Sequence, residues 1–326
     1  MSHQSHRYTE TLLREILRRQ DPPQFGRQYE PAIKPIREEA PGSSRPAWVW
    51  SELLQRDVST LSIPERVVLS IVLRHPALFE LQEQRMLPYL PATHPFFGHP
   101  LAIGMVLPSF RGTLAIAEEL GVLQWHPYIT KKSTGNEASV EIPAPWIGDF
   151  LLFLKDAIGP YCVNLSVKAT REGFIRPQVG ITPATNLKRA EQKEIVRQSV
   201  EQILYQEIGI PSRCIAADEV DPIVAANLRQ ILSWQKRKVP FDTQQYDEIV
   251  AAFNEGLRAG TTALKIIHRI ATSNCCRPYD VKIVMYHAIW RREIRIDLFQ
   301  YFFVDHPLIP ENRDVLEVYD HWFERS

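Results

Sequence analysis

Two charged residues at the ends of neighbouring apolar runs have the chemistry to act on a phosphate. Asp149 opens the run "DFLLFL", and Lys168 closes "YCVNLSVK", which follows after the turn-forming stretch "KDAIGP". Two such runs joined by a short turn predict a β-hairpin. The carboxylate and the lysine can then approach across the sheet, where an aspartate can hold a hard divalent cation and a lysine can stabilise charge on an attacked phosphate.

The second run alternates in character, which assigns its side chains to two faces of the strand. The more polar face holds Cys162, Asn164, Ser166 and Lys168, and the apolar face holds Val163, Leu165 and Val167. Spacing alone does not fix the chemistry. Asp149 can instead cap the "WIGD" turn, and Lys168 can be a solvated strand end.

Two glutamates on predicted helices are further candidates. At "SIPE", Ser62 and Glu65 form a capping box that starts a helix, so Glu65 also has an ordinary structural role. A helix predicted over about 187–208 carries Glu201 beside its apolar stripe, where a solvated side chain is the ordinary interpretation.

The bulk composition restricts the class of protein. The chain has 326 residues, with 38 Lys+Arg against 38 Asp+Glu, so any nucleic-acid contact must come from a local basic surface. It shows neither an apolar run of about 18 residues nor a signal-peptide hydrophobic region, which predicts a cytoplasmic protein without a membrane contact. The 4 cysteines show no C-x-x-C spacing, so neither a zinc site nor a disulfide framework is expected.

The order of predicted elements indicates an α/β fold. Residues 1–50, rich in Pro, Gly, Ser and Arg, predict an extended arm. Residues 51–238 alternate helices with short strands, including a strand at "SRCIAA" and a helix starting at Asp221, which predicts a mixed sheet flanked by helices. Polar loops are predicted at "KKSTGNE" and "ITPATN".

A second domain is predicted over residues 239–326. Three helical patterns are followed by "IRIDLFQYFF", which we expect to be a strand, and this order predicts a winged-helix module. Its third helix is expected to expose Lys282, Tyr286, Arg291 and Arg292, either as phosphate contacts or as a solvated helix end. The basic cluster "WQKRK" before the domain allows the same two interpretations.

Several segments, in order along the whole chain, resemble the TnsA endonuclease subunit of heteromeric bacterial transposases. The resemblance is carried by "GRQYEPAIKPIREEAPGSSRPAWVWS", "SIPERVVLSIVLRHPALFELQEQRMLPYLP", "LAIAEELGVLQWHP" and "IPSRCIAADEVDPIVAANLRQILSWQ". It implies a restriction-endonuclease-like PD-(D/E)xK core and a metal-dependent hydrolase that cuts DNA.

Residue by residue, Glu65 matches the family's helix glutamate, Asp149 its metal-binding aspartate and Lys168 its catalytic lysine. Glu201 matches a further acidic position, which the resemblance implies positions the lysine or shares a metal-bound water. One position departs: Ser166 stands where the family has glutamine and related nucleases have an acidic residue.

The implied mechanism uses one or two Mg²⁺ ions, with Mn²⁺ as a substitute. Glu65 and Asp149 would hold the metal, Ser166 and the Val167 carbonyl would add contacts, and Lys168 would orient or help deprotonate the attacking water. No covalent protein intermediate is needed.

The implied partners are double-stranded DNA at the transposon ends, a TnsB-type DDE transposase and a TnsC-type AAA+ ATPase. In that scheme this subunit makes the cut at the 5′ end of the element, the transposase makes the other, and the carboxy-terminal domain binds the ATPase. Two alternatives remain open: an inactive assembly adaptor, in which Ser166 marks a decayed site, and a free-standing restriction or repair nuclease.

Overall fold

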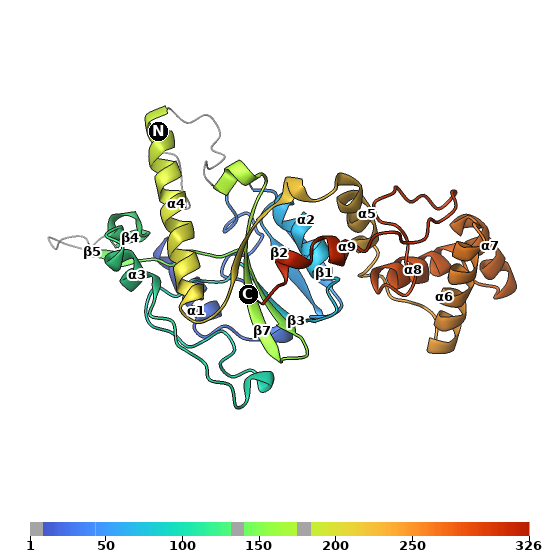
Figure 1. The fold of residues 1–326 in the computed structure, drawn as a ribbon, viewed down its shortest axis with the longest axis horizontal. Coiled ribbons are helices and arrows are strands. Elements are labelled where there is room, and N and C mark those ends of the chain that lie inside the picture. Colours follow the sequence, from blue (N-terminus) through green and yellow to red (C-terminus); the bar gives the residue numbers. More distant parts are fainter. Residues whose placement is uncertain (1–8, 43, 132–139, 175–183, 326) are drawn as a thin grey trace.

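The computed structural model describes residues 9–42, 44–131, 140–174 and 184–325. Of the predicted polar loops, residues 132–137 and 181–183 lie outside this part of the chain, whereas residues 184–186 belong to a helix and correct the prediction. Figure 1 shows an elongated molecule with a sheet near its middle, a helical group at one end, and the hairpin β4–β5 with α3 at the other. In the described residues no helix is long and apolar enough to cross a membrane.

A four-stranded mixed sheet forms the centre, as the sequence predicts. Its strands are β3 (Leu78–Glu83), β6 (Phe150–Lys155), β7 (Pro160–Lys168) and β8 (Ser212–Ala216), in the spatial order β3-β6-β7-β8. β6 runs antiparallel to both β3 and β7, whereas β7 and β8 are parallel. The predicted hairpin is therefore β6–β7, and it lies in the middle of the sheet.

Helices cover both faces of this sheet. The covering helices are α2 (Ile63–Val72) and α5 (Pro222–Leu232) on one face and α4 (Ala184–Gln206) on the other. β6 is apolar from Phe150 to Leu154 because its alternate side chains enter two cores. Its first set (Phe150, Leu152 and Leu154) packs with α2 and α5, and its second set (Leu151 and Phe153) packs with α4. The chain is thus of the α/β class in three layers (Figure 1).

Two predicted helix starts are confirmed by their caps. The Ser62 hydroxyl accepts from the Glu65 amide at the start of α2, at 3.2 Å. The Asp221 carboxylate accepts from the amides of Ile223 and Val224 at the start of α5, at 2.8 and 3.3 Å. In each case a proline follows the cap within the first turn.

The amino-terminal arm is not extended throughout, which corrects the prediction for residues 1–50. Glu10–Gln20 form helix α1, whose Ile16 is fully buried. Its Arg19 is anchored by Glu39 at 2.7 Å, so the rest of the arm folds back on the helix. A short 3₁₀ turn, η1 (Gly26–Gln28), leads on to a hairpin of β1 (Ala47–Ser51) and β2 (Arg56–Thr60).

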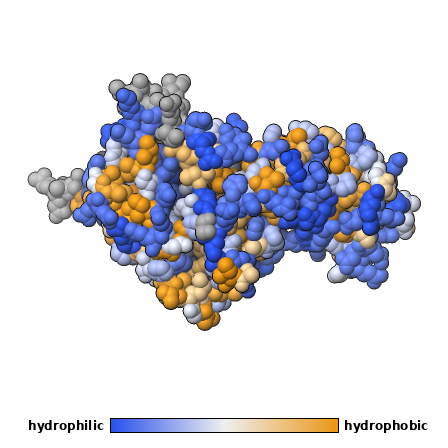
Figure 2. Space-filling model, in the orientation of Figure 1, coloured by the Kyte–Doolittle hydropathy of each residue, from blue (hydrophilic) through white to orange (hydrophobic). Residues whose placement is uncertain are grey.

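The segment between β3 and β6 builds one end of the molecule. It contains η2 (Pro100–Ala102), α3 (Thr113–Glu119), η3 (Leu123–Trp125) and the two-stranded pair β4 (Tyr128–Lys131) and β5 (Val140–Pro143). The loop around η2 exposes apolar side chains, with Ile103 at 87% and Val106 at 94%. Figure 2 shows hydrophobic colouring along the lower edge of the molecule in this view.

The three carboxy-terminal helices are confirmed, but the strand after them is not formed. The helices are α6 (Thr243–Arg258), α7 (Ala263–Ser273) and α8 (Pro278–Trp290). Residues 294–303 carry no strand; Ile296 makes one isolated bridge to Pro310. Apolar residues there, including Phe299 and Phe302, are buried one by one against the helices instead of alternating along a ladder.

Helix α8 is a central helix and not an exposed recognition helix. Tyr286, expected at the surface, is 1% exposed and stacks on Trp234 with ring centroids 4.6 Å apart. Arg291 and Arg292, which follow α8, pair with Glu52 and Asp314. The arginines that were predicted to contact phosphates therefore already form ion pairs within the chain.

The last residues return to the central sheet. α9 (Val315–Val318) and η6 (Asp320–Trp322) lie against the sheet domain, away from α6 and α7 (Figure 1). The Tyr161 hydroxyl donates to the Phe323 carbonyl at 3.0 Å, and Arg325 pairs with Asp156 in the β6–β7 turn at 2.7 Å. The segment after α8 therefore forms part of the core that contains the hairpin.

Candidate functional site

Asp149 directly precedes β6 and lies between the end of β3 and the end of β7. Its Oδ2 accepts from the Val167 amide at 2.6 Å, and its own carbonyl accepts from the Gln84 amide at 2.8 Å. The register that pairs Phe150 with Leu165 places Asp149 opposite Ser166. The side chain is half-buried, and in the described residues its Oδ1 accepts no hydrogen bond. One carboxylate oxygen is thus fixed and the other remains available.

Glu65 lies in the first turn of α2 and also faces Asp149. Its side chain accepts from the Leu61 amide and not from the Ser62 amide, so the reciprocal bond of the predicted capping box is not formed. Its Oε1 accepts from the Ser62 hydroxyl at 2.7 Å, and its Oε2 accepts from the Leu61 amide and the Gln84 side chain at 2.8 and 2.9 Å. Burial and then the negative charge of Asp149 raise the pKa of Glu65 to about 7. The place of Glu65 in the first turn of α2 and the site interpretation are therefore compatible.

Lys168 closes β7 on the same side of the sheet and lowers the pKa of Glu65 through its charge. Its Nζ pairs with Oε1 of Glu194 on α4 at 2.9 Å. Burial opposes the charged form of Glu194, but the cations Arg197 and Lys168 outweigh burial and lower its pKa to about 2. Glu194 is a site residue that the sequence interpretation missed.

Glu201 lies two helical turns beyond Glu194 and is 2% exposed. It accepts from Asn164 of β7 at 3.1 Å and pairs with Arg197 at 3.1 Å. Burial raises the pKa of Glu201, and Arg197 partly offsets this effect. The role expected of Glu201, holding the lysine, is taken at contact distance by Glu194.

Arg197 is a second cation at the site that the sequence interpretation missed. It pairs with Glu194 at 3.3 Å, with Glu201 at 3.1 Å, and donates to the Ile147 carbonyl at 3.4 Å. Burial opposes its charge, but the surrounding carboxylates, Asp149 among them, raise the pKa of Arg197. One guanidinium therefore connects α4 to the segment that leads into Asp149.

The polar face predicted for β7 is confirmed, and α4 covers it. Ser166 is buried on this face, with Cys214 of β8 as its parallel partner. Val167 directs its amide to Asp149, and since the amide and carbonyl of one strand residue point to the same side, its carbonyl lies on the Asp149 side too.

The donor chemistry of the site fits a hard cation. In the described residues no three His, Cys, Asp or Glu side chains are grouped as a metal site. The pair Glu65 and Asp149 nevertheless supplies two carboxylates that repel each other, and oxygen ligands of this kind are what Mg²⁺ prefers. A metal here would take its remaining ligands from peptide oxygens, water or a bound phosphate.

Neither a protein-family model nor a curated protein matches the chain.

Proposed function

We propose that this chain is a metal-dependent DNA endonuclease with a restriction-endonuclease-like core. The observation that supports this most is the convergence of Glu65, Asp149 and Lys168, from a helix, a strand start and a strand end that are distant in sequence. Glu65 feels the charge of both other residues: burial is the main cause of its raised pKa of about 7, Asp149 raises that pKa further, and Lys168 lowers it. Two carboxylates brought together in this way are able to hold a divalent cation.

In this proposal the bound Mg²⁺ supplies a water of lowered pKa and a counter-charge for the phosphate. The chain supplies orientation. Gln84 and the Leu61 amide fix Glu65, and the Val167 amide fixes Asp149. Lys168 places positive charge where the phosphoryl oxygens become more negative, or helps to deprotonate the water, and Glu194 holds it in place. Arg197 offsets the negative charges of Glu194 and Glu201 on α4.

The biological setting follows from the resemblance to TnsA. We infer that the substrate is double-stranded DNA at transposon ends, that the cut falls at the 5′ end, and that a DDE transposase and an AAA+ ATPase complete the assembly. On this basis the helical domain is proposed to bind the ATPase. Its α8 is mostly buried, so docking would use α6, α7 or the segment after α8.

An inactive assembly adaptor is the second candidate, and two observations favour it. Ser166 offers a shorter side chain than the acidic or amide residue of related nucleases, and Lys168 is already paired with Glu194 at 2.9 Å. A site that had lost its metal would tolerate both features.

The test is cleavage of end-labelled transposon DNA in Mg²⁺ by this chain together with its transposase and regulator. Asp149→Ala is expected to reduce 5′-end cuts by at least about a hundredfold while 3′-end cuts persist. Asp247→Ala, at an exposed position of α6, is the matched control and should cut normally. Identical products from the native protein and Asp149→Ala would reject the endonuclease and leave the adaptor.

A further inference from the structure

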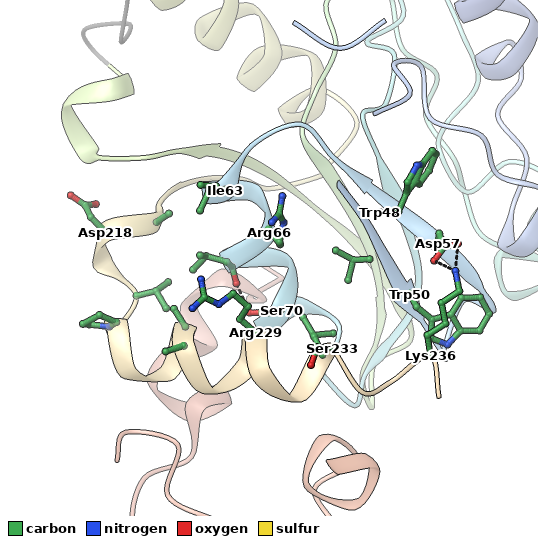
Figure 3. Close-up of a pocket in the computed structure, with 18 residues that line it drawn as sticks. Trp48, Trp50, Asp57, Ile63, Arg66, Ser70, Asp218, Arg229, Ser233 and Lys236 are labelled. Atoms are coloured by element: carbon green, nitrogen blue, oxygen red, sulfur yellow. Dashed lines mark hydrogen bonds and ion pairs between the residues drawn. The ribbon is translucent and has the colours of Figure 1, made fainter. Parts of the chain in front are cut away.

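An open groove of about 800 Å³ lies between α2, α5 and the β1–β2 hairpin, and we call it the α2–α5 groove. Figure 3 shows Trp48 and Trp50 at the hairpin end, with Ile63 and Arg66 from α2 and Arg229 from α5 along its length. Further apolar lining comes from Val67, Val220 and Leu232. Trp48 and Ile63 remain 48% and 45% exposed, so the part of the chain that the structure describes does not cover these walls.

Two cations in the middle of the groove have no carboxylate partner in the described residues. Arg66 donates to the Arg45 carbonyl at 3.0 Å, and Arg229 is exposed without an ion pair. The other cation, Lys236, is different, because it pairs with Asp57 at 2.8 Å where the hairpin closes the groove (Figure 3). The available positive charge is therefore concentrated between the two helices.

The surface continues across α5. A second hollow of about 450 Å³ shares Ala226, Arg229 and Ser233 with the α2–α5 groove. Its far side presents Tyr301 and Phe303, which are 57% and 54% exposed, with ring centroids 6.2 Å apart. Arg229 thus stands between two exposed apolar hollows.

We propose that the α2–α5 groove docks an acidic amphipathic segment of a partner protein. Apolar side chains of that segment fill the space beside Ile63 and Trp48, and its carboxylates meet Arg66 and Arg229. Apolar anchors at helical spacing beside a charged rim are the usual form of such docking. Duplex DNA fits less well, because a phosphate backbone needs a row of cations and gains little from apolar walls.

The groove shares a helix with the candidate catalytic site. Ile63, Arg66 and Val67 of α2 face the groove, while Glu65 of the same turns faces Asp149. An occupant therefore contacts the helix that positions Glu65. Docking itself needs no nuclease activity, so this inference stands or fails independently of the proposed function.

The test is selection of a phage-displayed library of random 16-residue peptides on the full chain. Selection is followed by fluorescence anisotropy of the enriched peptides in synthetic form. We expect sequences with apolar residues at i, i+3, i+4 and i+7 and with Asp or Glu between them. Arg229→Glu should weaken their binding about tenfold or more, and Ile63→Ser should weaken it as well. Arg258→Glu, an exposed arginine of α6, is the matched control.

Arg229 makes no hydrogen bond through its side chain among the described residues, so its reversal should leave the fold intact. Thermal unfolding of each variant checks this. Asp149→Ala should bind the peptides like the native protein even if it does not cut DNA. The inference is wrong if no acidic amphipathic sequence is enriched, or if Arg229→Glu and Arg258→Glu bind equally. Displacement of the peptide by a 30-base-pair duplex, with DNA binding lost in Arg229→Glu, would assign the groove to DNA instead.

Discussion

Glu65 lies in the first turn of α2, whose cap is Ser62, and is one of two facing carboxylates. Capping explains why a glutamate follows Ser62 at this spacing, but it does not explain a buried charge beside Asp149. The Gln84 side chain is not needed for a cap, yet it donates to Glu65.

The backbone φ of Gln84 is 47°. Gln84 thus adopts the left-handed region, which non-glycine residues seldom occupy. That backbone places its amide on the Asp149 carbonyl and its side chain on Glu65. Strain of this kind concentrates at functional sites, which agrees with the proposed role of the pair.

The raised pKa of Glu65 makes the stability of the metal-free protein depend on pH. Its folded-state pKa of about 7 exceeds the ordinary 4.5, so the fold binds this proton more tightly than the unfolded chain does. The stabilisation is fully present below about pH 4.5 and is lost as the pH rises through 7. In EDTA, the free energy of unfolding of the native protein should therefore fall by about 2 kcal/mol between pH 5 and pH 8, and Glu65→Gln should abolish this fall.

Urea unfolding at both pH values measures this difference. Glu141→Gln, at an exposed position, is the control and should change nothing. Mg²⁺ at pH 8 should stabilise the native protein more than Glu65→Gln, and equal stabilisation of the two would argue against Glu65 as a metal ligand.

Glu194 gives the opposite dependence on pH. Burial disfavours its charge, but Arg197 and Lys168 lower its pKa to about 2, so its contribution is present above about pH 4.5 and is lost as the pH falls toward 2. Glu194→Gln should cost about 2 kcal/mol at pH 7 and progressively less below pH 4. Chemical denaturation across this range measures the effect, with the exposed Glu118→Gln as control. A cost that does not change with pH would mean that the ion pair with Lys168 contributes nothing.

Sequence spacing identified Glu65, Asp149 and Lys168 as candidates because each lies at a helix start or a strand end. It missed Glu194 and Arg197 for a physical reason. Their partners lie on β7 and before β6, and the rotation of α4 that brings them there is set by tertiary packing. The apolar stripe of α4 was visible, but which polar flank would face Lys168 was not.

At the scale of elements, caps and turns were the most predictable features. Asp221 accepts from two amides of the first turn of α5, so Asp221→Ala should destabilise the protein by about 1 kcal/mol, whereas Asp221→Ser should retain most of the stability. Thermal unfolding measures both, with Asp247→Ala in the interior of α6 as the control. An unchanged melting temperature for Asp221→Ala would show that the packing of α5 makes its cap dispensable.

The elements that sequence did not predict depend on distant partners. The run "IRIDLFQYFF" has strand character, but the described residues offer it no partner strand, and its side chains are buried separately against α6–α8. In the arm, α1 contains neither proline nor glycine, but the Pro- and Gly-rich composition of residues 22–46 was assigned to all of residues 1–50. The stability of α1 comes from packing Ile16 and from the pair of Arg19 with Glu39.

At the scale of the whole molecule, one apolar core extends from the sheet through α2 and α5 to α6–α8 and the segment after them. Trp322 is 1% exposed within this core. Trp322→Ala should therefore cost about 3–5 kcal/mol and should destabilise the sheet and the helical group together.

Near-ultraviolet and far-ultraviolet circular dichroism on heating should show one shared transition at a lower temperature. Val318→Ala, which is 40% exposed on the neighbouring α9, is the control. Two separated transitions in the native protein would mean that residues 239–326 form an independent domain, as the sequence predicts.

The return of Arg325 to the β6–β7 turn has a consequence for synthesis. Arg325 and Asp156 are 169 residues apart. At about 5–20 residues per second, the ribosome needs on the order of ten to thirty seconds to make the intervening chain. During that interval the nascent hairpin lacks its contacts with Phe323 and Arg325, so the growing polypeptide exposes surface that a chaperone can bind.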